Sequence, residues 1–441
     1  MYFLFSLICL IFSAYFFYRA SGSLSPKKMN MISWVFWYSL VIQSFIASIL
    51  VVYNIDGHYG VQKIYFEESR VKGWLAVQYC MVALPLSMWV TLIFFKKRVS
   101  NKGAWNSFIS KNLSSCITTT NDLALRRVFY LFSIVCVLSV FYSFFSVGMY
   151  PFQGYISGGN ISGLRQSVTR EFGGIVYLKN IFGLALTPIL SYIFYCYYRL
   201  YKEKIDFVFF VILLLSSIAI VSFDYAKSPL AFYLLGFFFI KISLGDNINY
   251  IKLLKYFIAI LGLLVIFYIL TGYQDTVISL FNSYNSGLVG RLTISQAFGT
   301  YLAFDLYPIV YDHIGFSSLT DLFGESRERM AREIMLSVNS QGISDGTAGV
   351  VNTLFVAEAW ANFGLIGVIL SVIWVGFLIQ VLYSSIIYSR KTPVVLGVYA
   401  YLTCKLPITG GFNDFFYNPV LFTSIVLIFG IVLFVKLRVN R

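Results

Sequence analysis

The sequence is poor in charge. Only 12% of its 441 residues are Asp, Glu, Lys or Arg, whereas 59% are hydrophobic and 19% are aromatic. A water-soluble chain of this length needs far more polar side chains to cover its core, which excludes a soluble globular protein. Lipid must cover the outside instead, so we predict an all-α, polytopic integral membrane protein.

Several motifs of catalysis and ligand binding are also missing. His58 and His313 are the only histidines, and neither stands in a spacing that binds zinc. The chain has no phosphate-binding Gly-Lys-Ser loop, no Asp-x-Asp pair and no Gly-x-Ser-x-Gly elbow. None of the six cysteines falls in a segment expected outside the cytoplasm, so we predict no disulfide. We expect a reaction without a metal or another cofactor, or no reaction.

Long apolar runs are what the chain has in abundance. A helix needs roughly 20 apolar residues to cross a hydrocarbon layer of about 30 Å, and runs of this kind recur along the whole sequence. We predict about eleven transmembrane helices. Their expected ranges are 2–18, 31–53, 73–95, 128–147, 173–195, 206–222, 229–243, 256–271, 353–388, 394–409 and 417–435.

The distribution of charge predicts the orientation. With the amino terminus outside, 21 of the 33 Lys and Arg residues fall in inner segments and 15 of the 19 Asp and Glu residues in outer ones. Basic residues on the cytoplasmic side are the rule for membrane proteins. Topology therefore accounts for the formal net charge of +14, and we expect membrane lipids as partners and no nucleic acid.

The predicted topology divides the chain into three segments. Residues 1–271 hold the first eight helices with the outer loops 54–72 and 148–172. Residues 272–352 form one large outer loop with short or amphipathic helices, and residues 353–441 hold the last three helices. Because long loops on a rigid scaffold commonly carry function, the site residues are expected there.

Arginines mark two of the outer loops. The loop 148–172 has five glycines followed by Arg165 and Arg170, and flexible backbone beside two guanidinium groups suits a diphosphate. Arg291 in the large loop has no acidic neighbour in the sequence and also suits an anion. The alternative interpretations are a turn-rich loop that touches lipid head groups and, for Arg291, an interfacial arginine that reaches lipid phosphate.

A third basic stretch has a less specific pattern. In residues 325–333, acidic and basic side chains stand four apart, which favours an exposed helix that pairs its own charges. Leu322, Phe323, Met330 and Ile334 would form the apolar face of that helix, which would lie on the membrane or cap the site.

Three charged residues fall within the apolar runs. Lys179, Glu358 and Lys405 are costly in lipid and are expected to face the protein interior or a cavity. The run 353–388 is too long for one straight span, so we predict a short outer or re-entrant helix that carries Glu358, followed by the span itself. The structural alternative for Glu358 is an ion pair with one of the two lysines.

Two short motifs carry a family resemblance. Ser286-Gly287 through Arg291 is similar to a Ser-Gly-Arg motif that opens a large outer loop, and Asn352-Thr-Leu through Glu358, then Asn362-Phe-Gly364-Leu-Ile-Gly367, is similar to the motif that closes it. In these motifs and in its architecture, the chain resembles the O-antigen and capsule repeat-unit polymerases (Wzy type). These enzymes share a superfamily of membrane glycosyltransferases with the O-antigen ligases. Val351 stands where the ligases commonly have histidine, which favours a polymerase.

The resemblance implies a GT-C-like fold and a reaction at the periplasmic face of the bacterial inner membrane. Such enzymes polymerise oligosaccharide units carried on undecaprenyl diphosphate. A sugar hydroxyl of one unit attacks the anomeric carbon of another, and undecaprenyl diphosphate leaves. Arg165, Arg170 and Arg291 would stabilise the departing diphosphate. The partners implied are the lipid-linked oligosaccharides, membrane lipids, a chain-length regulator and a flippase.

Within this scheme Glu358 is the first choice for the general base, and Arg291 is the second catalytic residue. Four further residues are candidates for a base or for sugar contacts: Asp312, His313, Asp345 and Asn352. The alternatives to a polymerase are an O-antigen ligase and a polysaccharide flippase or transporter. The sequence has no internal repeat and few charges in its spans, which disfavours transport.

Overall fold

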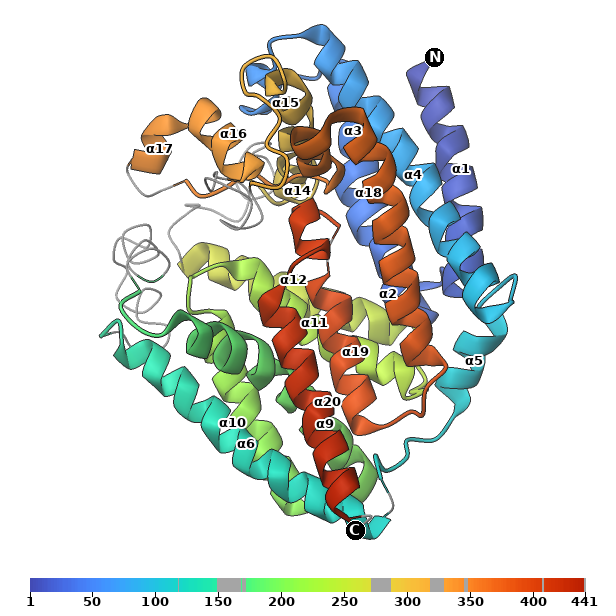
Figure 1. Ribbon diagram of the computed structural model, residues 1–441, viewed down its shortest axis with the longest axis vertical. Coiled ribbons are helices and arrows are strands. Elements are labelled where there is room, and N and C mark those ends of the chain that lie inside the picture. Colours follow the sequence, from blue (N-terminus) through green and yellow to red (C-terminus); the bar gives the residue numbers. More distant parts are fainter. Residues whose placement is uncertain are drawn as a thin grey trace. The chain divides into compact units, whose positions relative to one another are not determined.

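The chain folds into helices throughout its described part. The computed structural model describes residues 1–117, 119–148, 168, 172–270, 287–317, 329–344, 348–406 and 408–439. Every regular element in these ranges is a helix, as predicted (Figure 1). Eight of these helices are long and apolar enough to cross a membrane. The protein is therefore a polytopic membrane protein, and all regular elements in its described part are helices.

Each predicted span coincides with a helix. The eight that qualify as crossings are Tyr2–Lys28, Met31–Val52, Glu67–Lys96, Asp122–Phe145, Leu178–Tyr201, Lys204–Val221, Val356–Ile387 and Phe412–Arg438. The other three predicted spans correspond to α11 (Lys227–Ser243), α12 (Tyr250–Leu270) and α19 (Pro393–Lys405). Helices α11 and α19 have only 17 and 13 residues, fewer than the roughly 20 of a full crossing. The number of about eleven crossings thus stays a prediction.

Contacts within the chain group its residues into two compact units. Unit 1 consists of Met1–Trp105, Gln274–Ser385 and Pro407–Tyr417, and unit 2 consists of Asn106–Tyr273, Ile386–Leu406 and Asn418–Arg441. Each unit combines segments that are far apart in the sequence. The described part of the large loop 272–352 belongs to unit 1, together with the first three predicted spans.

Unit 1 is built around α4, which packs against α1, α3 and α15 (Figure 1). Its helices are α1 (Tyr2–Ser21), α2 (Met31–Trp34), η2 (Val35–Phe45), α3 (Ile46–Val52), α4 (Glu67–Lys96), α14 (Leu288–Leu292), α15 (Phe298–Leu306), α16 (Met330–Val338), α17 (Ser340–Ser344) and most of α18 (Val356–Ile387). Helix α18 also contacts α4, because the hydroxyl of Ser87 donates to the carbonyl of Ile373 at 2.7 Å. Element η2 is a π-helix, which the sequence pattern does not indicate.

The large loop is fastened to the start of α4 in unit 1. Asp305 of α15 is 1% exposed, and its carboxylate accepts hydrogen bonds from the backbone N–H groups of Tyr65 and Phe66 at 3.0 and 2.9 Å. Phe66 is the N-cap residue of α4, so a buried carboxylate satisfies donors at the positive end of this helix. The predicted outer loops 54–72 and 272–352 thus meet at one end of unit 1.

Unit 2 is centred on α9, which packs against α10, α19 and the π-helix η4. Its helices are α6 (Thr119–Phe145), η4 (Leu178–Leu186), α9 (Thr187–Tyr201), α10 (Lys204–Val221), α11, α12, α19 and α20 (Pro419–Val439). The contact between α9 and α19 is close, since a Cβ on Gly397 would lie 2.5 Å from the side chain of Ile193. Helix α20 covers η4 and α6.

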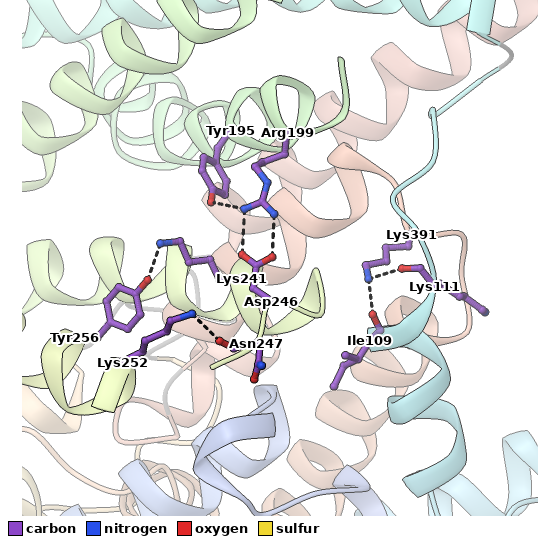
Figure 2. Close-up of polar contacts among 10 residues, drawn as sticks. All are labelled: Ile109, Lys111, Tyr195, Arg199, Lys241, Asp246, Asn247, Lys252, Tyr256 and Lys391. Carbon is purple, nitrogen blue, oxygen red and sulfur yellow. Dashed lines mark hydrogen bonds and ion pairs between the residues drawn. The ribbon is translucent and has the colours of Figure 1, made fainter. Parts of the chain in front are cut away.

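Loops predicted on the inner side form hydrogen bonds and ion pairs in unit 2, and Figure 2 shows these contacts. Arg199 binds both carboxylate oxygens of Asp246, at 2.9 and 3.0 Å. Lys391 donates to the backbone carbonyls of Ile109 and Lys111 at 2.9 and 2.7 Å, and burial lowers the pKa of its ammonium group to about 8. The basic loops therefore hold unit 2 together, in addition to their predicted effect on orientation.

Candidate functional site

Helix α18 is interrupted at Gly364, six residues after Glu358. Gly364 has φ +60° and ψ −145°, a conformation that side chains with a Cβ disfavour. A Cβ on Gly367 would lie 2.0 Å from the carbonyl oxygen of Ala359, so glycine is needed there for close approach of the backbone. The predicted division of the run 353–388 into a short helix and a longer one is confirmed.

A short loop, residues 313–315, closes the first half of α18. At the break, the carbonyls of Ala361 and Asn362 lose their partners within the helix. They accept hydrogen bonds instead from the backbone N–H groups of Ile314 and Gly315, at 2.9 and 3.0 Å. Nδ1 of His313 lies 3.2 Å from the carbonyl oxygen of Ala361, so its Nδ1–H tautomer donates there as well. The loop fixes the direction in which the short helix ends.

Glu358 lies at the centre of a charged cluster on this short helix. Its side chain is 1% exposed, and its two carboxylate oxygens accept hydrogen bonds from Nε and Nη2 of Arg329 at 2.8 and 2.9 Å. Oε2 also accepts the backbone N–H of Asn413 at 2.8 Å. A bidentate arginine and a third donor compensate the carboxylate for its loss of water.

Arg329 connects the buried carboxylate to the surface. Its Nη1 donates to Oδ1 of Asp414 at 3.1 Å, and the side chains of Arg329 and Asp414 are 39% and 48% exposed. Burial acts to lower the pKa of Arg329, but its hydrogen bonds to Glu358 and the charges of both carboxylates raise it above its ordinary value. The cluster holds one positive and two negative charges, so its exposed edge at Asp414 is acidic.

Three elements of unit 1 place these side chains. Arg329 is the N-cap residue of α16, Glu358 belongs to α18, and Asn413 and Asp414 come from the turn η7 (Phe412–Phe415). A Cβ on Gly411 would lie 1.7 Å from Nη2 of Arg329 and 2.4 Å from Oε2 of Glu358. Only glycine at that position leaves room for the ion pair.

The geometry gives the two carboxylates different chemical capacities. Both oxygens of Glu358 are engaged by Arg329 and Asn413, so this carboxylate orients the guanidinium group. Asp414 is half-exposed and can accept a proton from a hydroxyl group in solution. Arg329 uses three of its five N–H bonds within the cluster, and its other two make no hydrogen bond with a described residue and could donate to a ligand oxygen. Donor and acceptor thus stand side by side, an arrangement that suits a polar ligand such as a sugar.

Only one of the three arginines predicted to bind a diphosphate lies in the described part of the chain. Arg165 and Arg170 lie outside the described residues. Arg291 is half-buried in α14, where Gln296 donates to its backbone carbonyl at 2.8 Å. Burial raises the pKa of the neighbouring Tyr59, and the positive charge of Arg291 opposes that shift. Arg291 therefore brings positive charge to the end of unit 1 where the loops 54–72 and 272–352 meet.

The other predicted residues have different positions. Asp312 and His313 are exposed, and His313 contacts α18 at its break. Asn352 is exposed just ahead of α18, in a stretch held to α15 by the hydrogen bond from the N–H of Leu354 to Thr300 Oγ1 at 2.9 Å. Asp345 lies outside the described residues.

The predicted self-pairing of residues 325–333 is wrong for Arg329. This residue precedes α16 and turns toward Glu358 and Asp414, so it does not pair with the side chain four residues later. Arg332 donates to the backbone carbonyl of Gly349 at 3.0 Å. Leu322 and Phe323 lie outside the described residues.

The apolar face of α16 is directed into the protein. Met330 and Ile334 are fully buried in the same core cluster as Tyr301 of α15. The prediction that this helix lies on the membrane is therefore wrong, and the alternative prediction of a capping helix fits. Its packing also anchors Arg329 beside α18.

The alternative interpretation of Glu358, an ion pair with Lys179 or Lys405, is wrong as well. Glu358 pairs with Arg329, whereas Lys179 and Lys405 belong to unit 2 and line a cavity there. Asp414 and Asn413 were not predicted, because they stand in a short connection between two apolar runs. Arg329 and Asp414 are 85 residues apart, and no spacing rule links them. The glycine pair at 410–411 is the one signal of close backbone approach in that connection.

Comparison with known proteins adds no family to this geometry. In the described part of the chain, no three His, Cys, Asp or Glu side chains come close enough together to hold a metal ion. No protein-family model, no curated protein and no solved structure matches the chain.

Proposed function

We propose that the protein is a glycosyltransferase that polymerises oligosaccharide repeat units carried on a polyprenyl diphosphate, namely undecaprenyl diphosphate. The observation that carries this proposal is the cluster of Arg329, Glu358 and Asp414 at a broken helix of a polytopic membrane protein. The cluster offers an oriented guanidinium group and an accessible carboxylate next to the large loop. Polymers of surface polysaccharide, such as O-antigen, would be the product.

The proposed reaction joins two lipid-linked units. A hydroxyl group of the incoming unit attacks the anomeric carbon that links the growing glycan to its carrier. A carbon–oxygen bond forms there, the bond to the diphosphate oxygen breaks, and undecaprenyl diphosphate leaves with the bonding electrons. Asp414 takes the hydroxyl proton, and Arg329, positioned by Glu358, donates to a sugar oxygen. This assignment moves the base from Glu358 to the more accessible carboxylate.

The leaving diphosphate needs positive charge, which Arg165, Arg170 and Arg291 are proposed to supply. The proposal includes a GT-C-like architecture with about eleven crossings in the bacterial inner membrane. The site would face the periplasm, where the loops 148–172 and 272–352 are predicted to lie. A chain-length regulator and a flippase are the proposed protein partners.

Substitutions in the cluster test the proposal. A strain that lacks the gene is complemented with Arg329→Gln, with Asp414→Asn, or with the matched control Arg332→Gln from the same helix. The length of surface polysaccharide is read from an electrophoretic ladder, and the abundance of each variant in the membrane is measured alongside. We expect Arg329→Gln and Asp414→Asn to leave single repeat units, and Arg332→Gln to make long chains. Long chains from both cluster variants would reject these roles.

The deletion strain distinguishes the polymerase from its alternatives. A polymerase deletion leaves one repeat unit on the lipid A core, whereas loss of a ligase leaves long polymer on undecaprenyl diphosphate. Loss of a flippase instead leaves single units on the inner leaflet. Either of the last two outcomes would overturn the proposed function.

A further inference from the structure

Unit 2 contains a cavity that the proposed reaction does not use. Its volume is about 430 Å³, which lies in the range of small-molecule sites. The polar side chains in its wall are Lys179, Asn180, Asp224, Tyr401, Lys405 and Asn418. Most of the remaining wall is aliphatic, including Leu184, Ile220, Val221 and Leu421. The cavity thus combines a polar region with apolar sides.

Lys179 is the most buried charge in this wall. It stands in the π-helix η4 and is 8% exposed. Its ammonium group lies 3.9 Å from the ring centre of Phe172 and 5.6 Å from that of Phe223, so aromatic faces hold it in place. It forms no hydrogen bond or ion pair with a described residue. A buried ammonium group has three N–H bonds to satisfy, and rings accept them only weakly.

The cavity has an excess of positive charge. Lys405, at the last position of α19, is the second lysine in the wall and likewise forms no ion pair with a described residue. Asp224 is the single acidic residue among the described wall residues, and one of its oxygens accepts the backbone N–H of Ala226 at 3.1 Å. Its charge acts on both lysines. Among the described wall residues, one carboxylate and two ammonium groups give a net charge of +1.

The neutral polar groups add donors. Asn418 caps α20, since its Oδ1 accepts the N–H of Leu421 at 3.0 Å, and its amide N–H bonds, which no described residue accepts, could donate to a ligand. The hydroxyl of Tyr401 and the amide of Asn180 lie in the same wall. Several donors and two cations match a ligand that has many acceptor oxygens and a negative charge, for which phosphate is the common case.

The apolar part of the wall narrows the choice further. A free phosphate ion fills only a small part of 430 Å³ and leaves the aliphatic side chains without a partner. An amphiphilic phosphate ester fills both regions.

Lys179 and Arg199 are 20 residues apart along η4 and α9, a rise of about 30 Å. The cavity therefore lies one membrane thickness away from the basic loops of Figure 2, at the opposite end of these helices.

We propose that this cavity binds the phosphate or diphosphate group of an amphiphilic ester, with Lys179 and Lys405 as the cationic ligands. Oxygens of the phosphate group would accept hydrogen bonds from the two lysines, which have no hydrogen-bond or ion-pair partner among the described residues, and the hydrocarbon part would lie along the aliphatic wall. The inference rests on unit 2 alone and does not depend on the polymerase activity. A lipid head group and a free diphosphate share this chemistry, so the test separates them.

The test measures ligand binding to the purified full-length protein in detergent, by the shift in thermal unfolding and by calorimetry. The probes are farnesyl diphosphate, inorganic diphosphate and farnesol. We expect farnesyl diphosphate to bind, farnesol to bind far more weakly, and Lys179→Gln or Lys405→Gln each to weaken farnesyl diphosphate about tenfold or more. Inorganic diphosphate that binds as tightly as the ester would also support a phosphate site and assign it to a free anion.

Two further variants keep the outcome interpretable. Lys252→Gln, at the other end of unit 2, removes a lysine of the same kind and is expected to leave binding unchanged. Lys179→Arg keeps the charge and should retain most of the affinity, which guards against a folding defect in Lys179→Gln. Unchanged affinity in the double variant Lys179→Gln/Lys405→Gln, or equal binding of farnesol, would overturn the proposal. The polysaccharide ladder is not part of this readout, so a failed polymerase assignment leaves the result intact.

Discussion

At the scale of the residue, Glu358 shows how a carboxylate can be buried in an apolar helix. Its two oxygens accept three hydrogen bonds, two from Arg329 and one from the backbone of Asn413. Removing one partner of such a pair leaves an uncompensated charge, which costs about 3–5 kcal/mol. The same contacts that stabilise Glu358 engage the oxygens that a general base needs. Burial within a membrane protein therefore marks a charged residue as important without identifying it as the reactive group.

His58 is another buried titratable group of unit 1. Its side chain is fully buried, its Nδ1 accepts the backbone N–H of Gly60 at 3.2 Å, and its Nε2 lies 2.9 Å from the hydroxyl of Ser295. Nε2 therefore carries the proton of the neutral ring. Burial lowers the pKa of His58 to about 4, compared with about 6.5 in an unfolded chain.

This pKa shift predicts a loss of stability in mild acid. Between pH 6.5 and 4 the unfolded chain binds a proton at His58 that the folded chain does not, so the free energy of unfolding falls as the pH falls. The stabilisation is complete above pH 6.5, and the loss approaches about 3 kcal/mol near pH 4. Thermal unfolding in detergent from pH 7 to pH 4.5 measures it, and His58→Gln should show a smaller decrease over this interval. An equal decrease in stability from pH 7 to pH 4.5 in the wild type and in His58→Gln would contradict this account.

At the scale of the element, α18 depends on glycine at two places with different physical causes. Gly364 is needed for its backbone angles, and Gly367 is needed because Ala359 approaches it. The break releases the carbonyls of Ala361 and Asn362, which the loop 313–315 then binds. The short helix with Glu358 is thereby separated from the long apolar span that follows.

Alanine substitutions separate this requirement from ordinary helix propensity. Gly364→Ala is expected to lower the free energy of unfolding by about 1–3 kcal/mol, because alanine is strained at φ +60° and ψ −145°. Gly430→Ala in α20 is the matched control, since a Cβ there meets nothing within 4 Å and alanine favours a helix. Thermal unfolding of both purified variants gives the comparison. A Gly364→Ala protein as stable as the Gly430→Ala protein would mean that α18 can form one continuous helix without the break.

The elements could be predicted from the sequence, but the contacts between them could not. Apolar runs of about 20 residues have one stable form in lipid, so every predicted span coincides with a helix. The break in α18 followed from its excessive length. The ion pair between Arg329 and Glu358 spans 29 residues, and a local spacing rule gave Arg329 a different partner. The π-helical turns η2 and η4 have no signature in the apolar pattern.

At the scale of the whole molecule, loops that are predicted on the same side of the membrane contact one another within each unit. The loops 54–72 and 272–352, predicted to share the outer side, touch through Asp305 in unit 1. In unit 2 the segments predicted on the inner side meet around Asp246 and Lys391. The sequence could predict this sorting, because charge imbalance across a membrane acts on each loop separately.

Whether the loops 148–172 and 272–352 lie on the same side of the membrane depends on how many of the helices between them cross it. Those helices are α9 with η4, α10, α11 and α12, and four crossings return the chain to the same side. The failure of any one of them to cross would reverse the result, and α11, with 17 residues, is the shortest of the last three. We expect alkaline phosphatase fused after Gly159 or Ser317 to be active, and fusions after Asn101 or Asn247 to be inactive. Opposite activities at Gly159 and Ser317 would mean an odd number of crossings between them, and Arg165 and Arg291 then could not serve one substrate.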